Sequence, residues 1–168
     1  MKTKLLFALG LLIVLLLGCT VQNDSQALGK FTALEQKYFV TNGYISNPER
    51  MNEYASALAE LKAKTTGGPA KIIEAEVFSV NAFNYLNQTI IASTTITPQT
   101  KCFSKEIMSA IKLINIANEN ATKAVSLIQN LSDAEKKSLR ANQLETVQGY
   151  ATQIAQIKTY FTTKCGTK

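Results

Sequence analysis

The complete absence of histidine decides much of the chemistry that this chain of 168 residues can perform. Without an imidazole, the chain cannot form the Ser-His and Cys-His nucleophilic pairs or the usual His-containing zinc, haem and di-iron sites. We therefore expect no cofactor and no metal. The residues left with distinctive chemistry are the three cysteines, Cys19, Cys102 and Cys165.

The carboxylates give no support for acid-base catalysis. Glu74 and Glu76 stand two residues apart on an expected helix and so point to different faces. The other candidates stand on mostly polar helix stripes, namely Glu106, Glu119, Glu135 and Glu145. Solvated helix faces account for all of them better than a catalytic pair does. We therefore predict that the protein is not an enzyme.

Cys19 ends an N-terminal segment that has the parts of an export signal. Lys2 and Lys4 supply a positive end, and Leu5 to Leu17 is an apolar run of 13 residues. As a helix this run spans about 20 Å, less than the roughly 30 Å hydrocarbon core of a bilayer. A removable signal therefore fits better than a permanent transmembrane helix.

The end of this run, Leu16-Leu17-Gly18-Cys19, resembles the lipobox of prokaryotic lipoproteins. In that family the cysteine thiol receives a diacylglyceryl group, and the signal is cut just before the cysteine. The resemblance implies a signal peptide over residues 1–18 and a lipidated Cys19 that holds the protein in the cell membrane or outer membrane, facing the extracytoplasmic side. An ordinary signal peptide or an uncleaved anchor with an incidental cysteine is the alternative.

The remaining 150 residues are enough for one domain with a hydrophobic core. Residues 19–26 read as a polar tether and residues 27–168 as the domain. Two of the 18 basic residues leave with the signal, so 16 basic side chains face 12 acidic ones. The basic residues are scattered without a Lys/Arg-rich block, which argues against a nucleic-acid partner.

Apolar residues recur with helical spacing through most of the domain, which predicts an all-α, up-and-down helical bundle of about four to five helices. The helix after residue 70 should be the most buried. Two alternatives involve strands: a hairpin at Asn42-Gly43, and extended structure in the β-branched segments 72–80 and 89–97. The expected helices cover about 24–41, 47–64, 70–93, 101–130 and 132–163.

Local signals set the boundaries of these helices. Asn47-Pro48 should begin one helix, with the asparagine as N-cap. Ser132 and Glu135 match a capping box, so the last helix should start there at once. A turn as short as Asn130 to Ser132 then makes the last two helices an antiparallel hairpin.

This hairpin brings Cys102 and Cys165 together. Cys102 lies 30 residues before Ser132 and Cys165 lies 33 residues after it, so both fall at the open end, offset by about 5 Å. We therefore predict a disulfide that closes a loop of 62 residues, worth roughly 3 to 4 kcal/mol in the chain-entropy model. Two unrelated thiols are the alternative.

Two further features could carry function. Asn-X-Ser/Thr sequons occur at Asn23, Asn87, Asn120 and Asn130, and Asn130 and Asn120 are the candidate glycosylation sites if the host modifies exported proteins. An aromatic group could line a small apolar pocket between helices. Its members are Phe78, Phe83 and Tyr85, with Tyr150 or Tyr160.

The sequence thus predicts a membrane-anchored extracytoplasmic lipoprotein with a structural or protein-interaction role. Its expected partners are the membrane, through lipidated Cys19, and another envelope protein. The alternative is a helical module that binds a small apolar ligand. An exposed apolar patch would favour the first function, and a closed cavity with a few polar groups would favour the second.

Overall fold

The computed structural model describes residues 24–38, 40, 43–45 and 47–165, and these residues form helices and connecting segments without a strand. The predicted all-α bundle is therefore confirmed. The expected signal peptide, Cys19 and Asn42 lie outside the described residues. The helices are α2 (Asp24–Lys37), α3 (Pro48–Ala63), α4 (Gly67–Ser93), α5 (Lys105–Gln129), α6 (Asp133–Lys136) and α7 (Gln143–Cys165).

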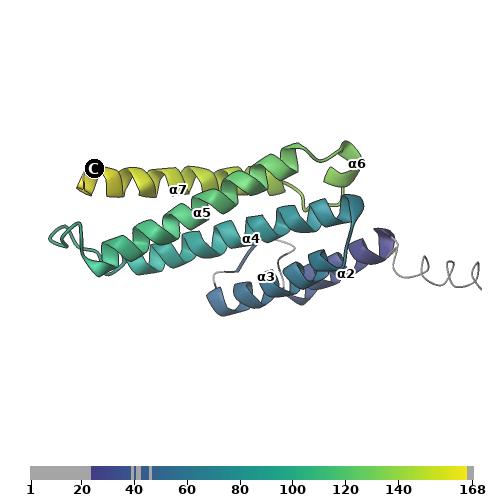
Figure 1. Cartoon of the computed structure of the whole chain (residues 1–168), viewed down its shortest axis with the longest axis horizontal. Coiled ribbons are helices and arrows are strands. Elements are labelled where there is room, and N and C mark those ends of the chain that lie inside the picture. The colour runs from purple at the N-terminus through teal and green to yellow at the C-terminus, as the bar shows by residue number, and fades with distance from the viewer. Residues whose placement is uncertain (1–23, 39, 41–42, 46, 166–168) are drawn as a thin grey trace, which may run out of the picture.

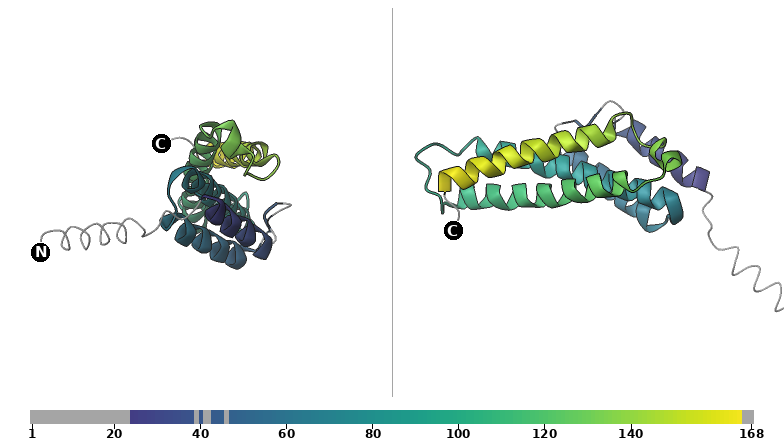
Figure 2. Two further views of the ribbon diagram at one scale, coloured as in Figure 1. Left: turned by 90° about the vertical axis from the view of Figure 1, so that its right-hand side faces the viewer. Right: turned by 90° about the horizontal axis from the view of Figure 1, so that it is seen from above.

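Three long helices, α4, α5 and α7, run side by side along the long axis of the molecule (Figure 1). The shorter α2 and α3 form a second layer against the first half of α4, so the far half of the bundle has three helices rather than five (Figures 1 and 2). The core follows this division. Phe31, Tyr54 and Leu58 pack on the first half of α4, whereas Leu86, Ile114 and Ile154 pack within the three-helix part.

The start of α3 agrees with the sequence signal. The Asn47 side chain accepts a hydrogen bond of 3.0 Å from the amide of Arg50, and Pro48 is the first helical residue. The same kind of cap moves the start of α5, since the Ser104 hydroxyl accepts from the amide of Ile107. Consequently α5 begins four residues later than predicted, and Cys102 lies in the segment between α4 and α5.

The predicted start of the last long helix is wrong. The capping box at Ser132 and Glu135 forms, but the helix that it begins, α6, ends at Lys136. The chain then turns through residues 137–142, where Asn142 has a positive φ of 60°, and α7 starts at Gln143. As a result of this turn, the side chains of Arg140 and Gln143 both point into the interior, where they donate to the same oxygen of Glu76.

The first helix also ends earlier than predicted, at Lys37 rather than near Thr41. The amide of Val40 bonds back to the carbonyl of Glu35, and the amide of Gly43, with φ of 117°, bonds to the carbonyl of Val40. These bonds turn the chain toward α3. The Val40 carbonyl also accepts a second hydrogen bond, from the side chain of Arg140.

As expected, α4 contributes the largest set of buried residues, although it starts at Gly67 rather than at residue 70. Two details differ from the prediction. Glu76, assigned to a solvated face, is completely buried, while Ile90 and Ile91, near the end of the helix that was expected to be the most buried, are about half exposed. The reason is that α2 and α3 cover the first half of α4 and leave its last turns without a second layer (Figure 1). None of the described helices is long and apolar enough to cross a membrane.

Candidate functional site

The strongest concentration of buried polar groups surrounds Glu76, in the middle of the apolar α4. The Tyr54 hydroxyl donates to one carboxylate oxygen over 3.0 Å, and Arg140 Nη2 donates to the other over 3.1 Å. The side-chain amide of Gln143 donates to the same oxygen as Arg140. Both oxygens of Glu76 therefore accept hydrogen bonds, as a buried charge requires.

Arg140 links Glu76 to three further groups. Its Nη1 donates to the carbonyl of Val40 over 3.0 Å, and its Nε lies 3.8 Å from a carboxylate oxygen of Glu35. Its guanidinium carbon also stands 4.4 Å from the centre of the Tyr44 ring, in a cation-π contact. One side chain from the α6–α7 turn thus contacts α2, the α2–α3 segment and α4.

The electrostatics of this cluster are those of two carboxylates that share one guanidinium. Burial raises the pKa of Glu76, but Arg140 and the hydrogen bonds from its neighbours act against this shift. Because Glu76 is surrounded by donors, its ionised form is the one that the site accommodates. Burial and the nearby charge of Glu76 raise the pKa of Glu35 to about 7, against a smaller lowering by Arg140.

We expect the stability of the protein to fall as the pH rises from about 4.5 to about 7. In this window folded Glu35 holds a proton that unfolded Glu35 has lost, so the free energy of unfolding decreases with pH, by about 1 to 3 kcal/mol. Urea denaturation at several pH values measures the slope, and Glu35→Gln, which cannot ionise, should flatten it. An unchanged slope in this variant would assign the effect to another group, such as Glu76.

A groove of about 260 Å³ opens beside the cluster, lined by the α2–α3 segment and the start of α7. Two of its lining residues, Tyr44 and Tyr150, pack against the ring of Phe83, at 5.2 Å and 5.5 Å between ring centres. Of the aromatic residues predicted to line a pocket, Tyr150 lines this groove and Phe83 packs against its lining residues, while Tyr44 was not predicted. The groove is lined by Gly43, Tyr44, Arg140, Ala141, Gln143, Thr146 and Tyr150.

The remaining predicted aromatic residues lie away from this groove. The Phe78 ring stands under the ammonium group of Lys123 at 5.3 Å, and the Tyr160 ring packs edge-on against Phe161. Tyr85 packs at the edge of the core that α4 forms with α5 and α7. These residues therefore serve separate parts of the bundle and do not form one pocket.

The predicted pairing of Cys102 and Cys165 is confirmed. Their sulfur atoms are at disulfide-bonding distance, and their Cα atoms are 5.2 Å apart, within the range that a disulfide allows. Lys164 reinforces the link, because its ammonium group donates to the carbonyl of Thr97 in the α4–α5 segment. The end of α7 is thereby fastened to the segment that precedes α5.

The candidate glycosylation sites differ in their surroundings. Asn130 is exposed at the end of α5, and Asn120 is half-buried within it. Both side-chain amides donate to backbone carbonyls four residues earlier, those of Ser126 and Ile116. Glycosylation at these sites stays a prediction.

The remaining carboxylates occupy solvated or capping positions. Glu74 pairs with Lys62 on the surface at 3.3 Å, and Glu135 caps α6. In the part of the chain that the structure describes, no group of three acidic or cysteine side chains is placed to hold a metal ion.

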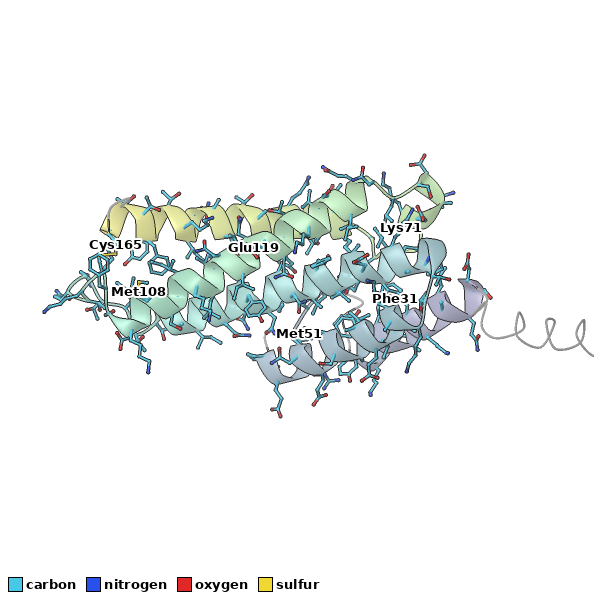
Figure 3. All side chains as sticks on the ribbon, in the orientation of Figure 1. Phe31, Met51, Lys71, Met108, Glu119 and Cys165 are labelled. Atoms are coloured by element: carbon cyan, nitrogen blue, oxygen red, sulfur yellow. A yellow bond between two sulfur atoms is a disulfide. The ribbon has the colours of Figure 1, made fainter. Side chains whose placement is uncertain are left out.

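A second feature is the end of the bundle at which α4 ends, α5 begins and α7 ends. We call residues 90–112 and 158–165 the tip. The large exposed apolar side chains of the described residues all belong to it: Ile90, Ile91, Phe103, Met108 and Tyr160. Figure 3 shows Met108 and Cys165 at this end and Phe31 and Lys71 toward the other.

Sequence reasoning missed both features. Glu76 lies between the apolar residues Ala75 and Val77 on the most apolar helix, which is a signal for a buried charge, and Arg140, one of two arginines in the chain, is its natural partner. No family model, curated protein or solved structure matches this chain. Its function must therefore be argued from the geometry of its own residues.

Proposed function

We propose that the protein is a membrane-anchored extracytoplasmic lipoprotein whose helical domain has a structural or protein-interaction role. The export signal and the Gly18-Cys19 junction support the anchor. One structural observation carries the role of the domain: its exposed apolar side chains gather at the tip. An exposed apolar group of this kind is typical of an interaction surface.

The position of the tip supports this proposal. Asp24, the first described residue, begins α2 toward the end of the molecule opposite the tip (Figure 1). At 1.5 Å per residue, the 27 residues of α4 alone extend for about 40 Å. An anchor attached a few residues before Asp24 would therefore leave the tip free to meet another component of the envelope.

The buried charges support a role other than catalysis. Each polar atom of the Glu76 carboxylate is already occupied by Tyr54, Arg140 or Gln143, and Arg140 is itself held by Val40 and Glu35. A catalytic group needs a free position for the reacting atom. The cluster instead joins α2, α3, α4 and the α6–α7 turn, which is a packing role.

The alternative function, binding of a small apolar ligand, has weaker support. The groove beside Arg140 holds about 260 Å³, and a second groove between α5 and α7 holds about 240 Å³. Ligand pockets usually hold roughly 300 to 1,000 Å³. A larger hollow on α3 is lined by three glutamates, Glu49, Glu53 and Glu60, which do not suit an apolar molecule.

The anchor can be tested in the native host. We expect Cys19→Ala to abolish lipidation, so that the protein is released or stalls with its signal attached. Mass spectrometry of the purified wild-type protein should find a diacylglyceryl mass on Cys19 and no residues 1–18. An unmodified Cys19 that follows an intact signal would contradict the proposal.

The role of the tip can be tested by site-specific photo-crosslinking in cells of the native host. A benzophenone amino acid in place of Phe103 should form crosslinks that the same group in place of Gln148 does not. Gln148 is a matched control, because it is exposed on α7 but lies outside the tip. Equal or absent crosslinking at both positions would remove the support for an interaction surface at the tip.

A further inference from the structure

We infer that the tip is a second membrane-contact surface, which binds a bilayer rich in anionic lipid. The inference deepens the proposed function and rests on it in one respect, the location of the domain at a membrane. The component of the envelope that the tip contacts is then a lipid bilayer. The evidence for this inference is the exposure, the charge and the spacing of the side chains at the tip.

Phe103 is the most exposed large apolar residue of the described chain, with 79% of its surface accessible. It lies between two exposed lysines, Lys101 and Lys105, in the segment that leads into α5. An aromatic ring beside cationic groups is the usual composition of a surface that enters the headgroup region of a membrane. The ring can enter the interface while the ammonium groups meet lipid phosphates.

The first turns of α5 continue this pattern. Lys105, Met108 and Lys112 are spaced three and four residues apart, so they share one face of the helix, and all three are exposed. The salt bridges of Lys62 and Arg140 lie outside the tip and do not involve these lysines. Because both ammonium groups are exposed to solvent, an external anion can reach them.

The charge of the tip is unlike that of the rest of the domain. The tip has one acidic residue, Glu106, while the remainder of the described chain has ten basic and eleven acidic side chains. A partner that is both anionic and able to accept apolar side chains complements this surface, and an anionic bilayer has both properties. The five basic residues of the tip are Lys101, Lys105, Lys112, Lys158 and Lys164.

The disulfide gives this surface a fixed shape. Cys165 joins the end of α7 to Cys102, one residue before Phe103, and Lys164 holds the carbonyl of Thr97. The segment that presents Phe103 is therefore tied to the end of α7 at two points. Less conformational entropy is lost on binding when a surface is already ordered.

The chain contains no tryptophan, so Phe103→Trp introduces a single fluorescent reporter at the tip. The full-length protein with this substitution is reconstituted into neutral phosphatidylcholine vesicles, which hold its N-terminal end. Vesicles of roughly one third phosphatidylglycerol and two thirds brominated phosphatidylcholine are then added. We expect the emission to shift to shorter wavelength and to be quenched by the bromine, and both effects to weaken with salt.

Charge reversal provides the matched comparison. Lys101→Glu with Lys105→Glu should weaken this binding by at least roughly 30-fold, which corresponds to two lysines at about 1 kcal/mol each. Lys136→Glu with Lys137→Glu makes the same change in net charge at exposed positions outside the tip. This control should bind like the parent protein.

Several results would overturn the inference. They are the absence of a spectral shift, an equal shift with added neutral vesicles, an equal loss of binding in the Lys136 and Lys137 control, or a shift without added vesicles that grows with protein concentration. The last would identify a second copy of the chain as the partner. Lipid on Cys19 is scored in the same preparations by mass spectrometry, so failure of the anchor and failure of the tip are separate outcomes.

Discussion

Arg140→Met should lower the free energy of unfolding by about 3 to 5 kcal/mol, because it leaves the buried Glu76 without its cation. The variant also loses the hydrogen bond to Val40 and the ion pair with Glu35. Urea denaturation followed by circular dichroism measures the change. At acidic pH the loss should be smaller, since protonated Glu76 no longer needs a cation.

Lys137→Met is the control, because it removes an exposed cation from the same α6–α7 turn, and we expect a change within about 0.5 kcal/mol. Adding Glu76→Gln to Arg140→Met replaces the charge by a neutral group that can still accept from Tyr54. The double variant should then be more stable than the sum of the single changes, by about 1 to 3 kcal/mol. Strict additivity would show that Glu76 and Arg140 do not interact.

Removal of the Cys102–Cys165 bridge should lower the free energy of unfolding by about 4 kcal/mol in the chain-entropy model, through greater freedom of the unfolded chain. For a domain of this size that corresponds to a decrease in melting temperature of roughly 10 °C. The variant is Cys102→Ser with Cys165→Ser. Calorimetry with and without reductant measures the effect.

Reductant should lower the melting temperature of the wild-type protein and leave that of the double variant unchanged. Each single variant should match the double variant, because either substitution removes the bridge. A wild-type protein whose thiols titrate as free before reduction would contradict the pairing. An oxidised protein that loses no stability on reduction would contradict the energetic argument alone.

The helices could be predicted where a local signal sets them. Asn47-Pro48 places the start of α3 because the asparagine oxygen caps the amide of Arg50, and because proline suits the first helical position, where an amide hydrogen would have no partner within the helix. The capping box at Ser132 and Glu135 likewise forms where it is expected. Such signals act between residues three or four positions apart, so the sequence contains all that they require.

The end of the helix that begins at Ser132 could not be predicted in this way. Nothing in the residues from Lys137 to Asn142 demands a turn as strongly as a proline would. The turn is stabilised by contacts of Arg140 with Glu76, 64 residues away, and with Val40, 100 residues away. The predicted cysteine pairing is correct although the predicted start of the last helix is wrong. The reason is that α7 is antiparallel to α5 and ends where α5 begins (Figure 1).

The sequence by itself therefore determined the helical class, the antiparallel order of α5 and α7, and the meeting of Cys102 and Cys165, all of which follow from helical periodicity and length. Tertiary structure alone decided that Glu76 is buried and that Ile90 and Ile91 are exposed. The physical reason is coverage: α2 and α3 are long enough to cover the first half of α4 but not its last turns (Figure 1). Whether a side chain on α4 meets water depends on that second layer, which periodicity along α4 does not encode.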